Sequence, residues 1–186
     1  MKYIETGIAD LWLCEANKYE DERGYFFEAF NRKDFAENTG LTVDFVQQNQ
    51  SKSAYGSLRG LHLQKGDSSQ AKLMRVIQGE VLDIVVDLRK DSATFGHHYK
   101  VLLSDENNKQ LFVPRHFAHG FLVLQPDTTF IYSCDTYYDK SAEVTLNYKD
   151  PQIAIDWPAV NGDYILSAKD EQGLDFKTVV ETLYGE

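Results

Sequence analysis

The strongest constraint on the fold is the alternating pattern of residues 80–89, which read Glu-Val-Leu-Asp-Ile-Val-Val-Asp-Leu-Arg. On a β-strand, Leu82, Ile84, Val86 and Leu88 share one face, because side chains alternate between the two faces. The opposite face alternates valine with aspartate. We therefore expect a strand with one core face and a second face that admits water or a ligand.

Other short runs rich in Val, Ile, Phe and Tyr are separated by turn residues, which is typical of an antiparallel sandwich or barrel. Helix signals are few. Asn31 is a good cap for a helix over 31–37 that stops before Gly40, and Phe176 to Leu183 have helical spacing. No repeat or linker divides the chain, so residues 1–186 are expected to form a single, mainly β domain with a few short helices.

Charge and cysteine content exclude several classes of function. A net charge of −10 argues against nucleic-acid and anionic-membrane partners, because both are bound through excess Lys and Arg. No run approaches the roughly 18 to 20 apolar residues of a membrane span. Cys14 and Cys134 form neither a disulfide framework nor a CxxC metal motif. We expect a soluble cytoplasmic protein.

Polar residues interrupt strand-like sequence in two segments, 57–64 and 111–121. On an ideal strand His62 and Gln64 share a face, and Arg59 joins them only if Gly60 introduces a kink or bulge. In the second segment His119 shares a face with Phe121 and Val123. His119 could therefore face the same interior as His62.

The two segments resemble the paired motifs of cupin barrels, many of which bind a metal through two histidines spaced HxH, a glutamate and a later histidine. Here Gln64 stands where the second histidine would be. The cationic Lys72 lies near the expected carboxylate ligand and would repel a divalent ion. The sequence therefore predicts no metal site.

A narrower resemblance rests on six stretches in matching order and spacing: 21–28, 47–51, 58–62, 72–76, 117–121 and 166–170. By these motifs the chain is similar to the dTDP-4-dehydrorhamnose 3,5-epimerases. Any one motif alone would be weak, but together they span most of the chain.

The resemblance implies a homodimeric cupin-type antiparallel β-barrel (jelly roll) that uses no metal and no cofactor. Its implied ligand is a dTDP-linked 4-keto-6-deoxy sugar. The implied reaction inverts carbons 3 and 5 of dTDP-4-dehydro-6-deoxy-D-glucose to give dTDP-4-dehydro-L-rhamnose, in dTDP-L-rhamnose biosynthesis.

The residue types suit that chemistry. A proton beside a ketone is removed when a base takes it while a donor stabilises the enolate oxygen. The resemblance implies His62 as base, Lys72 as donor, Tyr132 as acid on the opposite ring face, and Asp170 as the partner of His62. A competing interpretation is that Ser167 and Asp170 form a capping box at a helix start.

The resemblance also implies a binding set for the substrate: Arg23, Glu28, Gln47, Asn49, Arg59, Lys72, His119, Glu143 and Lys169. An N-terminal strand is expected to pair with the other subunit and to carry Arg23 and Glu28 to its pocket. Each residue has a simpler interpretation: turn residue for Arg23, solvated charge for the carboxylates and Lys169, loop cap for the amides, and core histidine for His119.

Two stretches depart from the family pattern, Lys65-Gly66-Asp67 and Arg115-His116, and both are expected near the pocket mouth. They leave open a relative that epimerises one carbon only or acts on another nucleotide sugar. Two further hypotheses are a non-catalytic sugar-binding cupin and a metal-dependent cupin enzyme.

Overall fold

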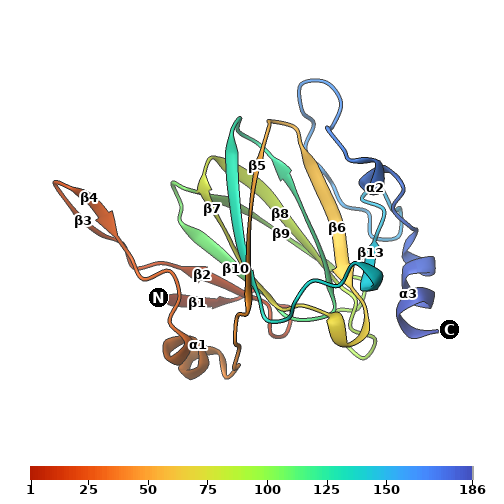
Figure 1. Cartoon of the computed structure of the whole chain (residues 1–186), viewed down its shortest axis with the longest axis horizontal. Coiled ribbons are helices and arrows are strands. Elements are labelled where there is room, and N and C mark those ends of the chain that lie inside the picture. The colour runs from red at the N-terminus through yellow and green to blue at the C-terminus, as the bar shows by residue number, and fades with distance from the viewer. Residues whose placement is uncertain (186) are drawn as a thin grey trace.

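A computed structural model describes residues 1–185 and shows a mainly β fold, as predicted (Figure 1). Three antiparallel sheets make up the fold. The six-stranded sheet has the order β1 (Lys2–Glu5), β2 (Trp12–Glu15), β10 (Lys109–Val113), β7 (Lys72–Gln78), β12 (Thr128–Cys134), β5 (Gln47–Ser53). The five-stranded sheet has the order β13 (Glu143–Thr145), β6 (Leu58–Gln64), β11 (Phe117–Val123), β8 (Glu80–Asp87), β9 (His98–Ser104).

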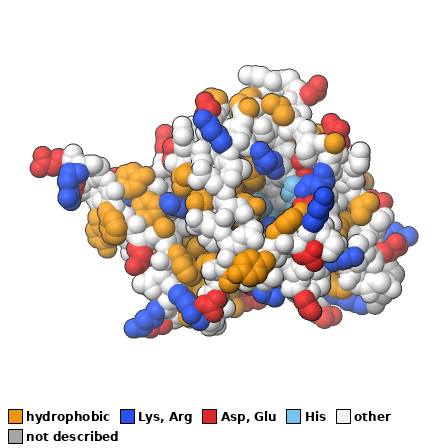
Figure 2. All heavy atoms as spheres, viewed as in Figure 1, with side chains coloured by type: hydrophobic (Ala, Val, Ile, Leu, Met, Phe, Trp, Pro, Cys, Tyr) orange, Lys and Arg blue, Asp and Glu red, His pale blue; other side chains and the backbone are white. Residues whose placement is uncertain are grey.

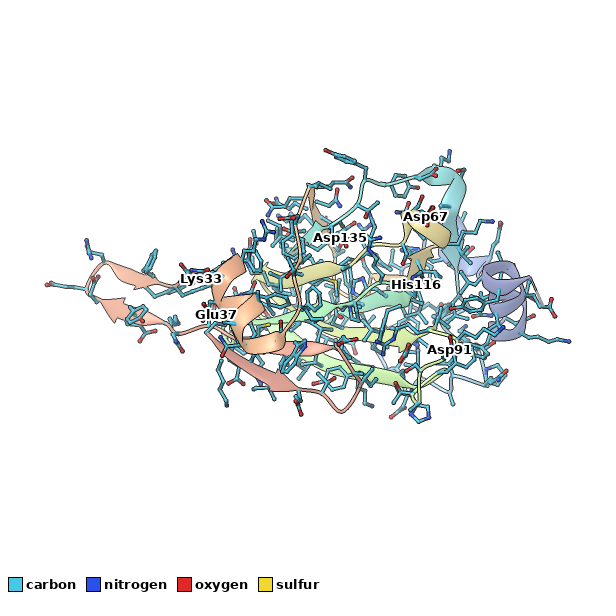
Figure 3. All side chains as sticks on the ribbon, turned by 90° about the horizontal axis from the view of Figure 1, so that it is seen from below. Lys33, Glu37, Asp67, Asp91, His116 and Asp135 are labelled. Carbon is cyan, nitrogen blue, oxygen red and sulfur yellow. The ribbon has the colours of Figure 1, made fainter. Side chains whose placement is uncertain are left out.

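The third sheet is the hairpin of β3 (Tyr19–Asp21) and β4 (Gly24–Phe26), which projects from the body of the molecule (Figures 1 and 3). Tyr19, Tyr25 and Phe26 are all exposed on it. Within residues 1–185, no helix has both the length and the apolar character that crossing a membrane requires.

The helices follow the sequence signals. Asn31 caps α1 (Arg32–Thr39) by accepting hydrogen bonds from two backbone N–H groups, and Gly40 ends the helix in the left-handed conformation. Helix α3 (Phe176–Tyr184) buries Phe176 and Val179. The remaining α-helix is α2 (Ala168–Glu171), and two 3₁₀ turns, η1 (Gly66–Ser68) and η2 (Lys140–Ala142), lie in the loops.

Strand β8 is buried on both faces, so the expectation that its second face admits water is wrong, while the alternative of a ligand beside that face stays a prediction. Leu82, Ile84 and Val86 form one core with α3. Val81 and Val85 belong to the other core, between the two large sheets. The reason is that β8 lies in the middle of a layered fold, with a sheet on one side and a helix on the other. The aspartates of that second face are buried with it.

Gly60 produces the bulge that the sequence required. His119 pairs with His62 and Phe121 pairs with Arg59, so three steps along β6 match two along β11. Arg59 and His62 consequently face the same interior. Gly60 has φ +117°, and a Cβ there would lie 2.6 Å from the Cα of Gly120. Only glycine fits this crossing of the two backbones.

This packing predicts that Gly60→Ala destabilises the protein by about 1–3 kcal/mol more than Gly24→Ala. Gly24 is a matched control, because its φ is +120° but nothing would lie within 4 Å of a Cβ added there. Both variants share the backbone strain, and only Gly60→Ala adds the clash. Chemical denaturation measures the difference, and equal losses would contradict the proposed contact.

Candidate active site

A cavity of about 400 Å³ lies between the two large sheets. The six-stranded sheet contributes Asn49, Lys72 and Tyr132 to its lining, and the five-stranded sheet contributes Arg59, His62 and His119. Figure 2 shows a histidine side chain in a hollow on this face, with Lys and Arg side chains around it. The volume suits a small-molecule ligand, and the basic lining suits an anionic one although the chain as a whole is acidic.

His62 and Asp170 form the tightest polar contact of the cavity, with 2.5 Å between Nε2 and Oδ1. Burial alone raises the pKa of Asp170, but hydrogen bonds from His62, the Ser167 hydroxyl and the Gly60 N–H lower it to about 2. Asp170 is therefore a carboxylate at neutral pH, and it accepts a hydrogen bond from the Nε2–H group of His62. That leaves Nδ1 of His62 free to accept a proton.

The motif that ends at Asp170 makes contacts related to both interpretations. Ser167 caps α2, because its hydroxyl oxygen accepts the backbone N–H of Asp170 at 3.3 Å. The same hydroxyl donates to the Asp170 carboxylate at 2.6 Å. Ser167 thus orients the Asp170 carboxylate through one oxygen, and the other oxygen contacts His62.

Lys72 and Tyr132 lie together on the opposite wall, with the Lys72 ammonium 5.8 Å from the centre of the Tyr132 ring. Burial lowers the pKa of Lys72, and the nearby Cys134, Asp83 and Glu143 partly oppose this. Burial raises the pKa of Tyr132, so the phenol keeps its proton. This wall therefore offers one ammonium and one neutral O–H donor.

The mouth of the cavity holds a second polar cluster. Lys169 and Glu143 form an ion pair of 2.7 Å, and the Tyr138 hydroxyl donates to Glu143 at 3.1 Å. Arg59 donates through Nε to the Ser53 hydroxyl at 3.0 Å. The remaining guanidinium nitrogens of Arg59 are left to meet a ligand.

Both polar atoms of the Gln64 amide hold neighbouring loops. Its nitrogen donates to the Ser68 carbonyl at 2.9 Å, and its oxygen accepts the Asp139 N–H at 2.6 Å. Across the described part of the chain, no group of three or more His, Cys, Asp or Glu side chains is placed to hold a metal ion.

Some predicted site residues lie outside the cavity. Arg23 is on the projecting hairpin, where its side chain is 88% exposed and paired with Asp21 at 2.6 Å. Glu28 follows that hairpin and is also absent from the lining. Gln47 does not line the cavity but contacts two residues that do. Its side chain donates to the Asn49 side chain and accepts a hydrogen bond from the Tyr138 N–H.

The two stretches that depart from the family pattern also lie outside the cavity lining. Arg115 pairs with Asp135 at 2.8 Å, and the His116 N–H donates to Ser69. Figure 3 labels Asp67, His116 and Asp135 in this region. The departures therefore lie in loops next to the cavity, where Lys65 lines a surface pocket together with Glu143 and Lys169.

Sequence reasoning missed several residues. Tyr138 and Ser167 line the cavity, Ser53 holds Arg59, and Asp83 accepts a hydrogen bond from His119 at 2.8 Å. A signal existed for Asp83, which stood on the aspartate-bearing face of its strand, and for Ser167, which was the capping residue. Tyr138 and Ser53 carried no local pattern that pointed to them.

Comparison with known proteins agrees with this geometry. Residues 5–178 match the sequence profile of dTDP-4-dehydrorhamnose 3,5-epimerase. A dTDP-4-dehydrorhamnose 3,5-epimerase from Shigella flexneri is 46% identical over 176 residues, which are 95% of this chain and 96% of that protein.

Two solved structures share the fold. A dTDP-4-dehydrorhamnose 3,5-epimerase from Elizabethkingia anophelis superposes with a TM-score of 0.92 at 49% identity, covering 96% of this chain and 97% of that one. An epimerase from Legionella pneumophila, solved in complex with dTDP-4-keto-L-rhamnose, gives 0.93 at 43% identity, covering 98% and 96%. The chain belongs to the dTDP-4-dehydrorhamnose 3,5-epimerase family.

Proposed function

We propose that this protein is a dTDP-4-dehydrorhamnose 3,5-epimerase, which inverts carbons 3 and 5 of dTDP-4-dehydro-6-deoxy-D-glucose. The observation that carries the proposal is the placement of His62 and Tyr132 on opposite walls of one cavity, with Lys72 beside Tyr132. Inversion needs a base and an acid on opposite faces of the sugar ring, and the two sheets supply one each.

The proposed reaction begins when Nδ1 of His62 removes a proton from the carbon next to the ketone. Asp170 stabilises the positive charge that the imidazole gains, because its carboxylate is ionised and hydrogen-bonded to Nε2. Lys72 donates to the developing enolate oxygen. Tyr132 then delivers a proton to the other face of the same carbon. Solvent takes the proton from His62 and returns one to Tyr132, so that the same steps can invert the second carbon.

The nucleotide diphosphate is proposed to bind at the basic mouth of the cavity. Arg59 has guanidinium nitrogens to spare, and Lys169 is half exposed beside Glu143. Both are natural partners for phosphate oxygens. The polar residues proposed to complete the set are Gln47, Asn49, His119 and Glu143.

We propose that two copies associate through the projecting hairpin and that each hairpin brings Arg23 and Glu28 to the partner's cavity. The hairpin stands off the body and exposes Tyr19, Tyr25 and Phe26. Exposed aromatic side chains grouped on one element mark an interface. We also propose a cytoplasmic location, since Cys14 and Cys134 are free thiols.

The first test is incubation with dTDP-4-dehydro-6-deoxy-D-glucose in D₂O, followed by NMR of the product. The wild-type chain should give the doubly inverted ketone with deuterium at carbons 3 and 5. His62→Ala should neither exchange nor invert, because no positioned base remains. Tyr132→Phe should still exchange from the His62 side but form little inverted product.

The outcomes separate the competing functions. Inversion and labelling at one carbon only would replace the proposal with a single-carbon epimerase. Binding without any exchange would indicate a sugar-binding protein. Normal inversion by Tyr132→Phe would show that another group delivers the second proton.

For Lys72→Met we expect kcat to fall about 10²- to 10³-fold with little change in dTDP affinity, as for loss of one oxyanion donor. Because burial lowers the pKa of Lys72, the wild-type kcat should fall on the alkaline side below the ordinary lysine pKa of 10.5. That limb requires protonated Lys72, so it should be absent from the residual activity of Lys72→Met. An unchanged rate would remove Lys72 from the mechanism.

Mixing two inactive variants tests the shared site. A heterodimer of Arg23→Ala and His62→Ala contains one intact cavity if Arg23 acts on the partner, so equal mixing with subunit exchange should restore about a quarter of wild-type activity. If Arg23 acts within its own chain, mixing restores nothing. If Arg23 has no role, Arg23→Ala alone keeps wild-type activity. His62→Ala mixed with Lys72→Met is the control, because both residues lie in one cavity and no complementation is expected.

A further inference from the structure

The buried carboxylate of Asp83 has one hydrogen bond and one unused oxygen. Asp83 lies on β8 with 0% of its surface exposed. Its Oδ2 accepts from Nε2 of His119 at 2.8 Å. Its Oδ1 is buried without a hydrogen-bond partner among residues 1–185. A buried carboxylate that is only half satisfied costs folding free energy, so a purely structural role explains it poorly.

Asp87 shows what a structural carboxylate on the same face of the same strand looks like. It is also 0% exposed. Its two oxygens accept hydrogen bonds from the Arg89 guanidinium and backbone, the Ser92 hydroxyl and the Thr94 hydroxyl. Asp83 has none of this support. Within residues 1–185 its carboxylate is hydrogen-bonded to His119 alone, and over a longer distance its charge raises the pKa of Lys72 against the effect of burial.

The His119 ring is held in one orientation. Asp83 and His119 lie diagonally across the β8–β11 pair, where Phe121 is opposite Asp83 and Val85 is opposite His119. The ring stacks on Phe130 with an interplanar angle of 18°. His119 lines the cavity, and its Nδ1 has no hydrogen-bond partner in the described chain.

We propose that Asp83 is a positioning residue that holds the Nε2 proton of the His119 ring, so that Nδ1 accepts a hydrogen bond from a hydroxyl of the bound hexose. The inference rests on the proposed function, because the hexose is that of the 4-keto sugar nucleotide. A carboxylate can only accept, and it therefore selects the tautomer with the proton on Nε2. His62 on the neighbouring strand β6 has the same kind of contact, because its Nε2 also faces a carboxylate oxygen, that of Asp170 in α2.

The test compares Asp83→Asn with Asp87→Asn. An amide fills the same space, but it can present either its oxygen or its NH₂ to His119, so it no longer selects one tautomer. For Asp83→Asn we expect kcat/KM to fall about 10- to 100-fold, the usual loss when the partner of a functional imidazole is removed. The melting temperature should be equal to that of the wild type or higher. Asp87→Asn should melt several degrees lower with an unchanged kcat/KM.

Two further measurements do not depend on turnover. In ¹⁵N spectra of the ring nitrogens, with the His119 signals identified by their loss in His119→Gln, the wild type should show protonated Nε2 and bare Nδ1. Asp83→Asn should show both tautomers.

Calorimetry with dTDP, which lacks the hexose, should give affinities within about twofold for wild type and Asp83→Asn.

A double-mutant cycle tests whether Asp83 acts through His119. Asp83→Asn should have no additional effect on kcat/KM in a His119→Gln background.

The proposal is overturned if Asp83→Asn keeps wild-type kcat/KM, melts as low as Asp87→Asn, binds dTDP much more weakly, or leaves the His119 tautomer unchanged. A wild-type chain that fails to turn over the sugar nucleotide would sink the proposed function instead, while the tautomer and melting measurements would still decide the role of Asp83.

Discussion

The structure depends on one interior that two sheets share, in which apolar packing and buried charge have to coexist. Val81, Val85 and Phe130 fill one part of this space, and the cavity occupies another. Three carboxylates at the cavity each have a basic partner: Asp170 with His62, Asp83 with His119, and Glu143 with Lys169. Such pairing is the condition for burying charge. Arg59 and Lys72 have no ion-pair partner in the described chain, so both cations remain available to an anionic ligand, within a protein of net charge −10.

Gly60 connects the backbone to the chemistry. Its bulge turns Arg59 and His62 to the same side, and its close contact with Gly120 brings β6 against β11. Its own N–H donates to Asp170, which helps to keep that carboxylate ionised. A single residue without a side chain thus sets the direction of two functional side chains and the charge of a third. The backbone irregularity is part of the site because a regular strand would separate these groups onto two faces.

Local patterns predicted what local physics decides. The alternating pattern of residues 80–89 identified β8, and the Asn31 cap identified α1. The spacing of two residues between His119 and Phe121 placed both side chains on the inner face. The sequence also indicated that Arg59 could share a face with His62 only if Gly60 introduced a kink or bulge. Alternation could not tell which face lies between two sheets, so water was one of the two expectations for the second face of β8, although a sheet covers that face. The partners of Tyr138 and Ser53 come from elements that no local pattern brings together. The roles of His62, Tyr132 and Lys72 came from the family resemblance, since periodicity shows that side chains share a face but not what they do.

The His62–Asp170 pair shows how the fold keeps the partner of a proposed base ionised over a wide pH range. The pKa of Asp170 is about 2 in the folded protein, below the ordinary value near 3.9. A lowered pKa contributes stability that is complete above the unfolded value and is lost as the pH falls toward the folded one. The link between β6 and α2 therefore weakens only between about pH 4 and pH 2. Above that window Asp170 does not titrate, so its support of His62 is constant across the physiological range. Any pH dependence of the proton transfer near neutrality must then come from the reacting groups themselves, because the carboxylate that positions the base keeps its charge.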